Sequence, residues 1–130
     1  MGLDNGFEVK GVTRRQLPRG IKYPWDSQYD KDGVEVAYFR KYWGFRNTYL
    51  TALNRRFADE VYEYDLSPAD LQLAIDILKN YIVNDPHDAD GGYWDASTKK
   101  HLKAMRNNLK KIYRWWKAHP TVKIIFYDSY

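Results

Sequence analysis

The amino-acid sequence predicts an α+β domain in which an antiparallel or mixed sheet is packed by helices. Segments of alternating apolar and polar residues predict strands, and segments with apolar residues three and four apart predict helices. These segments follow one another in the order β-β-α-β-α-α-β. A length of 130 residues with 44% hydrophobic content suffices for one globular domain and is short for two. We therefore expect residues 1–130 to form a single α+β domain.

The first third of the chain predicts two strands and a long connection. Residues 6–12 alternate Phe7 and Val9 with charged neighbours, and residues 34–42 are β-branched and aromatic. The residues between them contain prolines, glycines and many charges, which is typical of a loop. We expect the second strand to pair antiparallel with the first. Strict alternation divides the second strand into two faces, Val34, Val36, Tyr38 and Arg40 against Glu35, Ala37, Phe39 and Lys41.

The middle of the chain predicts two helices separated by a third strand. Apolar spacing indicates a helix over residues 43–58, and alternation indicates a strand over residues 60–66. Ser67 and Asp70 flank a proline, which together form a strong start signal for a helix over residues 68–83. Apolar residues nearly encircle this helix, so we expect it to be the central and most buried one.

The last third predicts an amphipathic helix and a final strand. After a loop over residues 84–94, Ser97 is expected to cap a helix over residues 98–119. One side of this helix is apolar and includes Trp116, and another side is basic. Residues 121–127 alternate but are apolar on both faces, which predicts a strand near the middle of the sheet.

Charge is distributed unevenly along the chain. The formal net charge is +4, yet residues 43–96 hold four basic residues against ten acidic ones, and residues 97–130 hold nine against one. Eight of the nine basic residues in this last segment lie on the predicted last helix. A one-sided run of this density favours binding to a polyanion or an acidic protein surface. The alternative is a solvated face that balances the acidic middle segment.

Aromatic residues are the second departure from an average composition. Twelve tyrosines and five tryptophans exceed what a small core takes up, because each buried phenol or indole needs a partner for its polar hydrogen. Trp25 lies in a charged loop, and Trp94 follows two glycines as either a lid over the core or a recognition anchor. The candidate binding residues are Arg14, Arg15, Tyr23, Trp25, Trp94, Lys99, Lys103, Arg106, Lys110, Arg114 and Trp115.

The sequence lacks the motifs of familiar catalytic and metal sites. It has no cysteine, no phosphate-binding glycine loop, no nucleophile elbow and no paired-histidine zinc motif. The one candidate metal loop contains Asp85, His87, Asp88, Asp90 and Asp95. Pro86 and Ser97 interrupt the ligand pattern of an EF-hand there, so a solvated acidic loop is the expectation. We therefore expect no catalytic residues, no metal and no cofactor.

Two short segments carry a resemblance to a known group of proteins. Residues 1–6 read Met-Gly-Leu-Asp-Asn-Gly, and residues 38–41 read Tyr-Phe-Arg-Lys. The first third of the chain resembles small phage and prophage proteins that begin with MGLD and carry a Tyr-(Phe or Trp)-Arg-Lys strand before a helix. That resemblance implies an origin on a mobile element, where small proteins without catalytic residues often bind and block a host machine, as anti-CRISPR inhibitors do. It assigns no catalytic residue.

These observations give three hypotheses of function. The favoured one is a non-enzymatic phage-type protein that inhibits a host defence protein or ribonucleoprotein through a basic and aromatic surface. The alternative is a nucleic-acid-binding accessory protein of a phage or mobile element, and a remote alternative is a small hydrolase or nuclease. No apolar run is long enough to span a membrane, and we expect a soluble protein of the host cytoplasm with no membrane partner.

Overall fold

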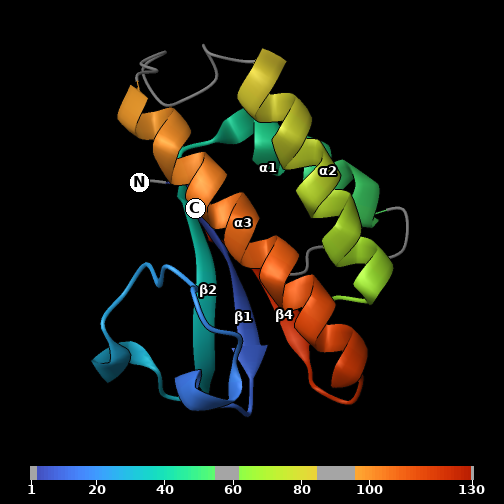
Figure 1. The fold of residues 1–130 in the computed structure, drawn as a ribbon. Helices are drawn as coiled ribbons and strands as arrows, with labels where there is room; N and C mark the ends of the chain where they lie inside the picture. Colours follow the sequence, from blue (N-terminus) through green and yellow to red (C-terminus); the bar gives the residue numbers. More distant parts are fainter. Residues whose placement is uncertain (1–2, 55–61, 85–95, 130) are drawn as a thin grey trace.

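The computed structural model describes residues 3–54, 62–84 and 96–129, which share one hydrophobic core. Four antiparallel strands form a sheet in the order β2-β1-β4-β3 (Figure 1). The strands are β1 (Asp4–Lys10), β2 (Gly33–Arg40), β3 (Glu63–Asp65) and β4 (Ile124–Ser129). The helices are α1 (Trp43–Asn54), α2 (Pro68–Asn84) and α3 (Ala96–Ala118). The predicted α+β class and element order are confirmed.

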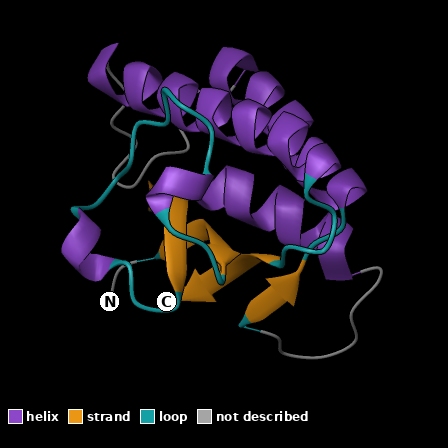
Figure 2. Ribbon diagram, turned by 60° about the horizontal axis from the view of Figure 1, so that its bottom comes forward, coloured by secondary structure: helices purple, strands orange, loops and turns teal. Residues whose placement is uncertain are grey.

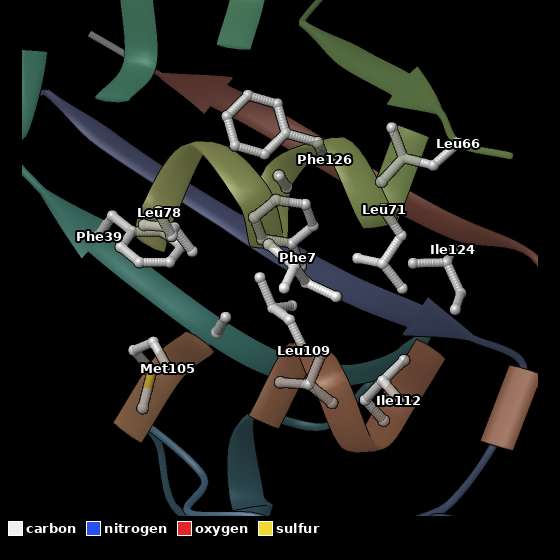
Figure 3. Packing of buried hydrophobic residues seen from close by; sticks show 14 of the residues in the cluster. Phe7, Phe39, Leu66, Leu71, Leu78, Met105, Leu109, Ile112, Ile124 and Phe126 are labelled. Atoms are coloured by element: carbon white, nitrogen blue, oxygen red, sulfur yellow. The ribbon is translucent and has the colours of Figure 1, made fainter. Parts of the chain in front are cut away.

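The helices lie together on one side of the sheet, as Figure 2 shows. We name this side the core face and the opposite side the outer face. On the core face, the rings of Phe7 and Phe126 pack with centroids 4.9 Å apart, and Tyr49 of α1 meets Phe126 at the same distance. Leu109 and Ile112 of α3 complete the packing (Figure 3). Helix α2 packs between α1 and α3, so its predicted central position is confirmed.

Helix α3 runs along the free edge of β2 and bonds to its backbone through side chains. His101 Nε2 lies 2.8 Å from the Tyr38 carbonyl oxygen, and Asn108 Nδ2 donates to the Val36 carbonyl at 2.9 Å. The same Asn108 amide makes two hydrogen bonds with the backbone of Lys22. Lys22 N–H donates to Asn108 Oδ1 at 2.9 Å, and Asn108 Nδ2 donates to the Lys22 carbonyl at 2.8 Å. Because these contacts occupy backbone groups that an edge strand otherwise exposes, α3 covers this edge of the sheet.

The start of α2 matches the predicted signal. Asp70 N–H donates to Ser67 Oγ at 3.2 Å, and Ser67 N–H donates to the Asp70 carboxylate at 2.9 Å. This reciprocal pair satisfies two backbone donors that a helix start leaves free.

Several element boundaries differ from those that the sequence predicts. Strand β1 ends at Lys10 because Gly11 adopts a φ of 70°, and β2 ends before Lys41, whose φ is 64°. Strand β4 begins three residues later than predicted. The reason is a turn in which Val122 N–H donates to the His119 carbonyl and the Val122 carbonyl accepts from Trp116 Nε1.

Helix α3 begins before its predicted cap, and some predictions fall where the structure gives no description. Ser97 lies inside the first turn of α3, because the helix begins at Ala96. Three predictions lie outside the described residues: the helix end over residues 55–58, the start of the third strand, and Trp94. None of the helices that the structure describes is both long and apolar enough to cross a bilayer.

Candidate functional site

A β-bulge in β2 determines which side chains meet on the outer face. Phe7 of β1 pairs with Ala37, whereas the next residue, Glu8, pairs with Glu35, so Val36 is an extra residue without a partner on β1. The predicted alternation of β2 is therefore wrong. Glu35 and Tyr38, which strict alternation places on opposite faces, lie on the same outer face.

Glu35 is the centre of a hydrogen-bonded cluster on this outer face. The Tyr127 hydroxyl of β4 donates to Glu35 Oε1 at 2.6 Å, and Trp25 Nε1 donates to Oε2 at 3.0 Å. Burial raises the pKa of Glu35 to about 7, with the two hydrogen bonds opposing this shift and the charges of Glu8 and Asp4 adding to it. A carboxyl group that titrates near neutral pH in a hollow is a candidate functional group.

The bond between Tyr127 and Glu35 passes over the intervening strand β1 at Gly6. A Cβ at Gly6 would lie 2.5 Å from Tyr127 Cε2 and 2.6 Å from Glu35 Oε1. A glycine is therefore required where these two side chains meet above the backbone. The phenol of Tyr127 has a raised pKa, because it is buried and donates to Glu35.

A second phenol–carboxylate pair lies beside this bond. The Tyr38 hydroxyl donates to Asp4 Oδ1, and burial followed by this hydrogen bond raises the pKa of Tyr38 to about 12. The Trp25 ring packs on Tyr38 with centroids 4.8 Å apart. Trp25 thereby joins the 11–32 loop to the outer face of the sheet.

A hollow of about 330 Å³ opens next to Glu35. It is lined by Glu8, Trp25, Tyr29, Asp30 and Glu35. We name it the outer-face hollow. Trp25 and Tyr29 are among the exposed large apolar side chains of the described chain, with 41% and 61% of their surfaces accessible.

Arg14 and Tyr23, which the sequence marks as binding residues, support the wall of this hollow. Arg14 Nε donates to the Asp30 carboxylate at 2.6 Å, and Nη2 donates to the Trp25 carbonyl at 2.6 Å. The guanidinium lies 4.1 Å above the Tyr23 ring centroid. Arg14 therefore holds the loop together, whereas Arg15 is exposed on the short 3-10 helix Arg14–Gln16.

The predicted basic residues of α3 separate into two groups. Lys99, Lys103 and Arg114 are exposed, as predicted for a binding surface, and Lys110 is half-buried. Arg106 turns toward α2, where its Nε donates to the Ile75 carbonyl at 3.0 Å. The prediction that Arg106 belongs to the free basic surface is therefore wrong.

The exposed side of α3 forms what we name the basic face. It consists of Lys99, Lys100, Lys103, Arg114 and Lys117. Within the described ranges, no carboxylate lies within ion-pair distance of these five side chains. Part of this face is a hollow of about 440 Å³ lined by Lys22, Lys99, Lys100, Lys103, Ala104 and Asn107.

Trp115, a further predicted binding residue, is half-buried beside the basic face. Its ring stacks on His119 with centroids 4.4 Å apart and an interplanar angle of 18°. One face of the indole is thus already occupied. Trp94 and residues 85–95 of the predicted acidic loop lie outside the described residues, whereas Asn84 is the last residue of α2. Among the described residues, no group of three or more His, Asp or Glu could hold a metal ion.

Sequence reasoning did not mark the Glu35 cluster, although two signals bear on it. Glu35 is an acidic residue inside an apolar strand, and Gly6 is a glycine inside another. The bulge that brings Tyr38 beside Glu35 has no signature in the sequence. Comparison of the chain with protein-family models, curated proteins and solved structures finds no match.

Proposed function

We propose that this chain is a non-enzymatic binding protein whose basic face on α3 docks against an anionic surface of its partner. The observation that carries the proposal is the concentration of Lys99, Lys100, Lys103, Arg114 and Lys117 on one exposed face, without a neighbouring carboxylate among the described residues. Charges left without internal partners are available to an external anion.

Repulsion between like charges on α3 favours a binding function for the basic face over a face that only contacts water. Lys99 and Lys103 are four residues apart on the helix, as are Lys110 and Arg114. Like charges at this spacing destabilise a helix by about 0.2–0.5 kcal/mol for each pair. An acidic partner would remove this cost and add attraction, whereas a purely solvated helix gains from alternating signs.

The partner we favour is a host defence protein, met by a phage-type inhibitor in the host cytoplasm. The resemblance at residues 1–6 and 38–41 supports a mobile-element origin. The second candidate partner is nucleic acid, and the four lysines around the 440 Å³ hollow favour it as a phosphate contact. The stacking of Trp115 on His119 speaks against base stacking by this indole.

Charge reversal on the basic face tests the proposal. The test variant changes Lys99, Lys103 and Arg114 to Glu, and the control changes Arg19, Lys31 and Lys79, which are also exposed. Both variants have the same net charge, so they differ only in where the charge is lost. We expect affinity capture from a bacterial lysate to retain one partner with the wild type and the control and to lose it with the test variant.

A second measurement separates protein from nucleic acid. Binding of a labelled duplex is followed across a salt series, where phosphate contacts give a steep negative slope of log affinity against log salt concentration. A steep slope that only the test variant removes would favour nucleic acid. Equal capture by all three proteins, together with no duplex binding, would contradict the role of the basic face.

A further inference from the structure

The outer-face hollow has the shape and chemistry of a small recognition site. Its volume of about 330 Å³ is at the lower end of the range typical of ligand pockets. Two exposed aromatic side chains, Trp25 and Tyr29, have ring centroids 6.2 Å apart at an interplanar angle of 64°. The hollow opens on the outer face, away from the helices, so an inference about it is independent of the function proposed for α3.

The three carboxylates that line the hollow differ in their partners. Asp30 is bound by Arg14 at 2.6 Å, and Glu8 lies 3.5 Å from Lys10. Among the residues that the structure describes, Glu35 accepts hydrogen bonds only from the neutral groups of Tyr127 and Trp25, and no Lys or Arg pairs with it. Each carboxylate oxygen has a second lone pair, so Glu35 can still accept from a cation.

Two arginines of this chain each contact a carboxylate and an aromatic ring, which are the two kinds of group that line the hollow. Arg14 binds Asp30 through two nitrogens and lies 4.1 Å above the ring of Tyr23. Arg46 binds Asp128 through two nitrogens, with its guanidinium 5.7 Å from the ring of Trp43.

We propose that the outer-face hollow binds a guanidinium group, with Glu35 as its carboxylate partner and Trp25 and Tyr29 as its aromatic walls. A guanidinium is planar and weakly hydrated, and it donates two parallel hydrogen bonds to a carboxylate while its face lies on a ring. Glu8, which also lines the hollow, adds negative charge. The group is either an arginine side chain of a peptide or a free small guanidine.

The test follows the Trp25 indole N–H resonance by NMR, because this group contacts Glu35 directly. Trp25→Phe assigns the resonance by its loss. At pH 8 the protein is titrated with N-acetylarginine N-methylamide, with agmatine, and with N-acetylcitrulline N-methylamide, which has a similar shape and no charge. We expect saturable shifts with the two guanidines and at least about tenfold weaker binding of the citrulline compound. Tighter binding of N-acetylarginine N-methylamide than of agmatine indicates an arginine of a peptide. Tighter binding of agmatine indicates a free small guanidine.

Two further arms make the test decisive. Glu35→Gln should weaken guanidine binding about tenfold or more, whereas Glu63→Gln, which changes an exposed carboxylate on β3, should leave it unchanged. Wild-type protein at pH 5.5 should also bind about tenfold or more weakly, since a protonated Glu35 is not the competent form. This arm needs no variant to fold. Absence of saturable shifts, equal binding of the citrulline compound, or affinity that neither Glu35→Gln nor low pH reduces would each overturn the proposal.

Discussion

Glu35 occupies a position where burial and hydrogen bonding act in opposite directions on its charge. Burial disfavours the carboxylate, while the Tyr127 hydroxyl and Trp25 Nε1 stabilise it, and burial prevails. The pKa of about 7 in the folded protein exceeds the ordinary glutamate value of 4.5. Between these two values the folded state binds more protons than the unfolded state, so the stability contribution of this group falls as pH rises from 4.5 to 7.

Replacing Glu35 with Gln should therefore stabilise the protein at high pH. The amide can accept from Trp25 and donate to the Tyr127 oxygen, so both contacts survive. At pH 8 we expect a gain on the order of 1–2 kcal/mol, which is less than the full shift implies because the side chain is only partly buried. At pH 5, just above the unfolded value of 4.5, the gain should be several-fold smaller. Chemical denaturation at both pH values measures it, with Glu63→Gln as a control, and a gain that does not depend on pH would exclude the carboxylate charge as its cause.

Gly6 is the second residue whose identity has a direct structural consequence. Gly6→Ala would place a methyl group 2.5 Å from Tyr127 Cε2 and 2.8 Å from the Ala37 carbonyl oxygen. Because the latter is backbone and cannot move freely, we expect a loss of about 1–3 kcal/mol in the free energy of unfolding. Gly11→Ala, where no atom lies within 4 Å and only the φ of 70° opposes a side chain, should cost about 1 kcal/mol. Equal losses in urea denaturation would contradict the crowding at Gly6.

At the scale of elements, the contact between α3 and the edge of β2 depends on one buried amide. Asn108 is 1% exposed and joins α3, β2 and the 11–32 loop through hydrogen bonds to Lys22 and Val36. The sequence predicts the helix and the strand, since both patterns are regular. It does not predict that a polar residue inside α3 faces the sheet, because an asparagine in a helix is more often solvated.

Asn108→Ala should destabilise the protein by about 3 kcal/mol, because the carbonyl of Val36 and the backbone groups of Lys22 lose their partner. The adjacent Asn107 is exposed, and Asn107→Ala changes the same side chain on the same helix. That variant should stay within about 0.5 kcal/mol of the wild type. Thermal denaturation of both variants compares them, and similar losses would show that the amide contacts contribute little.

Element boundaries were the least predictable part of the fold, for identifiable reasons. The ends of β1 and β2 are set by left-handed backbone at Gly11 and Lys41. The start of β4 is delayed by the turn that Trp116 closes through the Val122 carbonyl. These causes are tertiary or conformational, whereas the start of α2 rests on local contacts between Ser67 and Asp70 and was predicted correctly.

At the scale of the whole molecule, tryptophans divide between core and surface as the sequence predicts where the structure describes them. Trp116 is 4% exposed and Trp25 is 41% exposed. Trp116→Ala should cost about 3–5 kcal/mol of stability. Trp25→Ala should cost less stability and, as a recognition residue, about 2 kcal/mol of binding free energy. Chemical denaturation measures the stability of both variants, and calorimetric titration with N-acetylarginine N-methylamide measures the loss of binding at the outer-face hollow in Trp25→Ala. An equal loss of stability in the two variants would contradict the assignment of Trp25 to a recognition surface.

The candidate sites were predictable only in part. A helix wheel identifies Lys99, Lys103 and Arg114 as exposed, because helical periodicity fixes their direction. The same wheel cannot show that Arg106 reaches the Ile75 carbonyl, since that contact depends on where α2 lies. The outer-face cluster escapes sequence analysis more completely. It needs the bulge at Val36, the absence of a side chain at Gly6 and a strand from the far end of the chain.

That last requirement governs how the molecule is completed during synthesis. Strand β4 is an inner strand between β1 and β3, and the bond from Asn5 to Asp128 joins residues 123 positions apart. Until β4 leaves the ribosome, β1 and β2 can form a hairpin, but one edge of β1 stays open. Glu35 then lacks the hydrogen bond from Tyr127. Late closure of a sheet favours slow folding and temporary exposure of a strand edge. The open edge of β1 is therefore expected to remain available to other strands until β4 pairs with it.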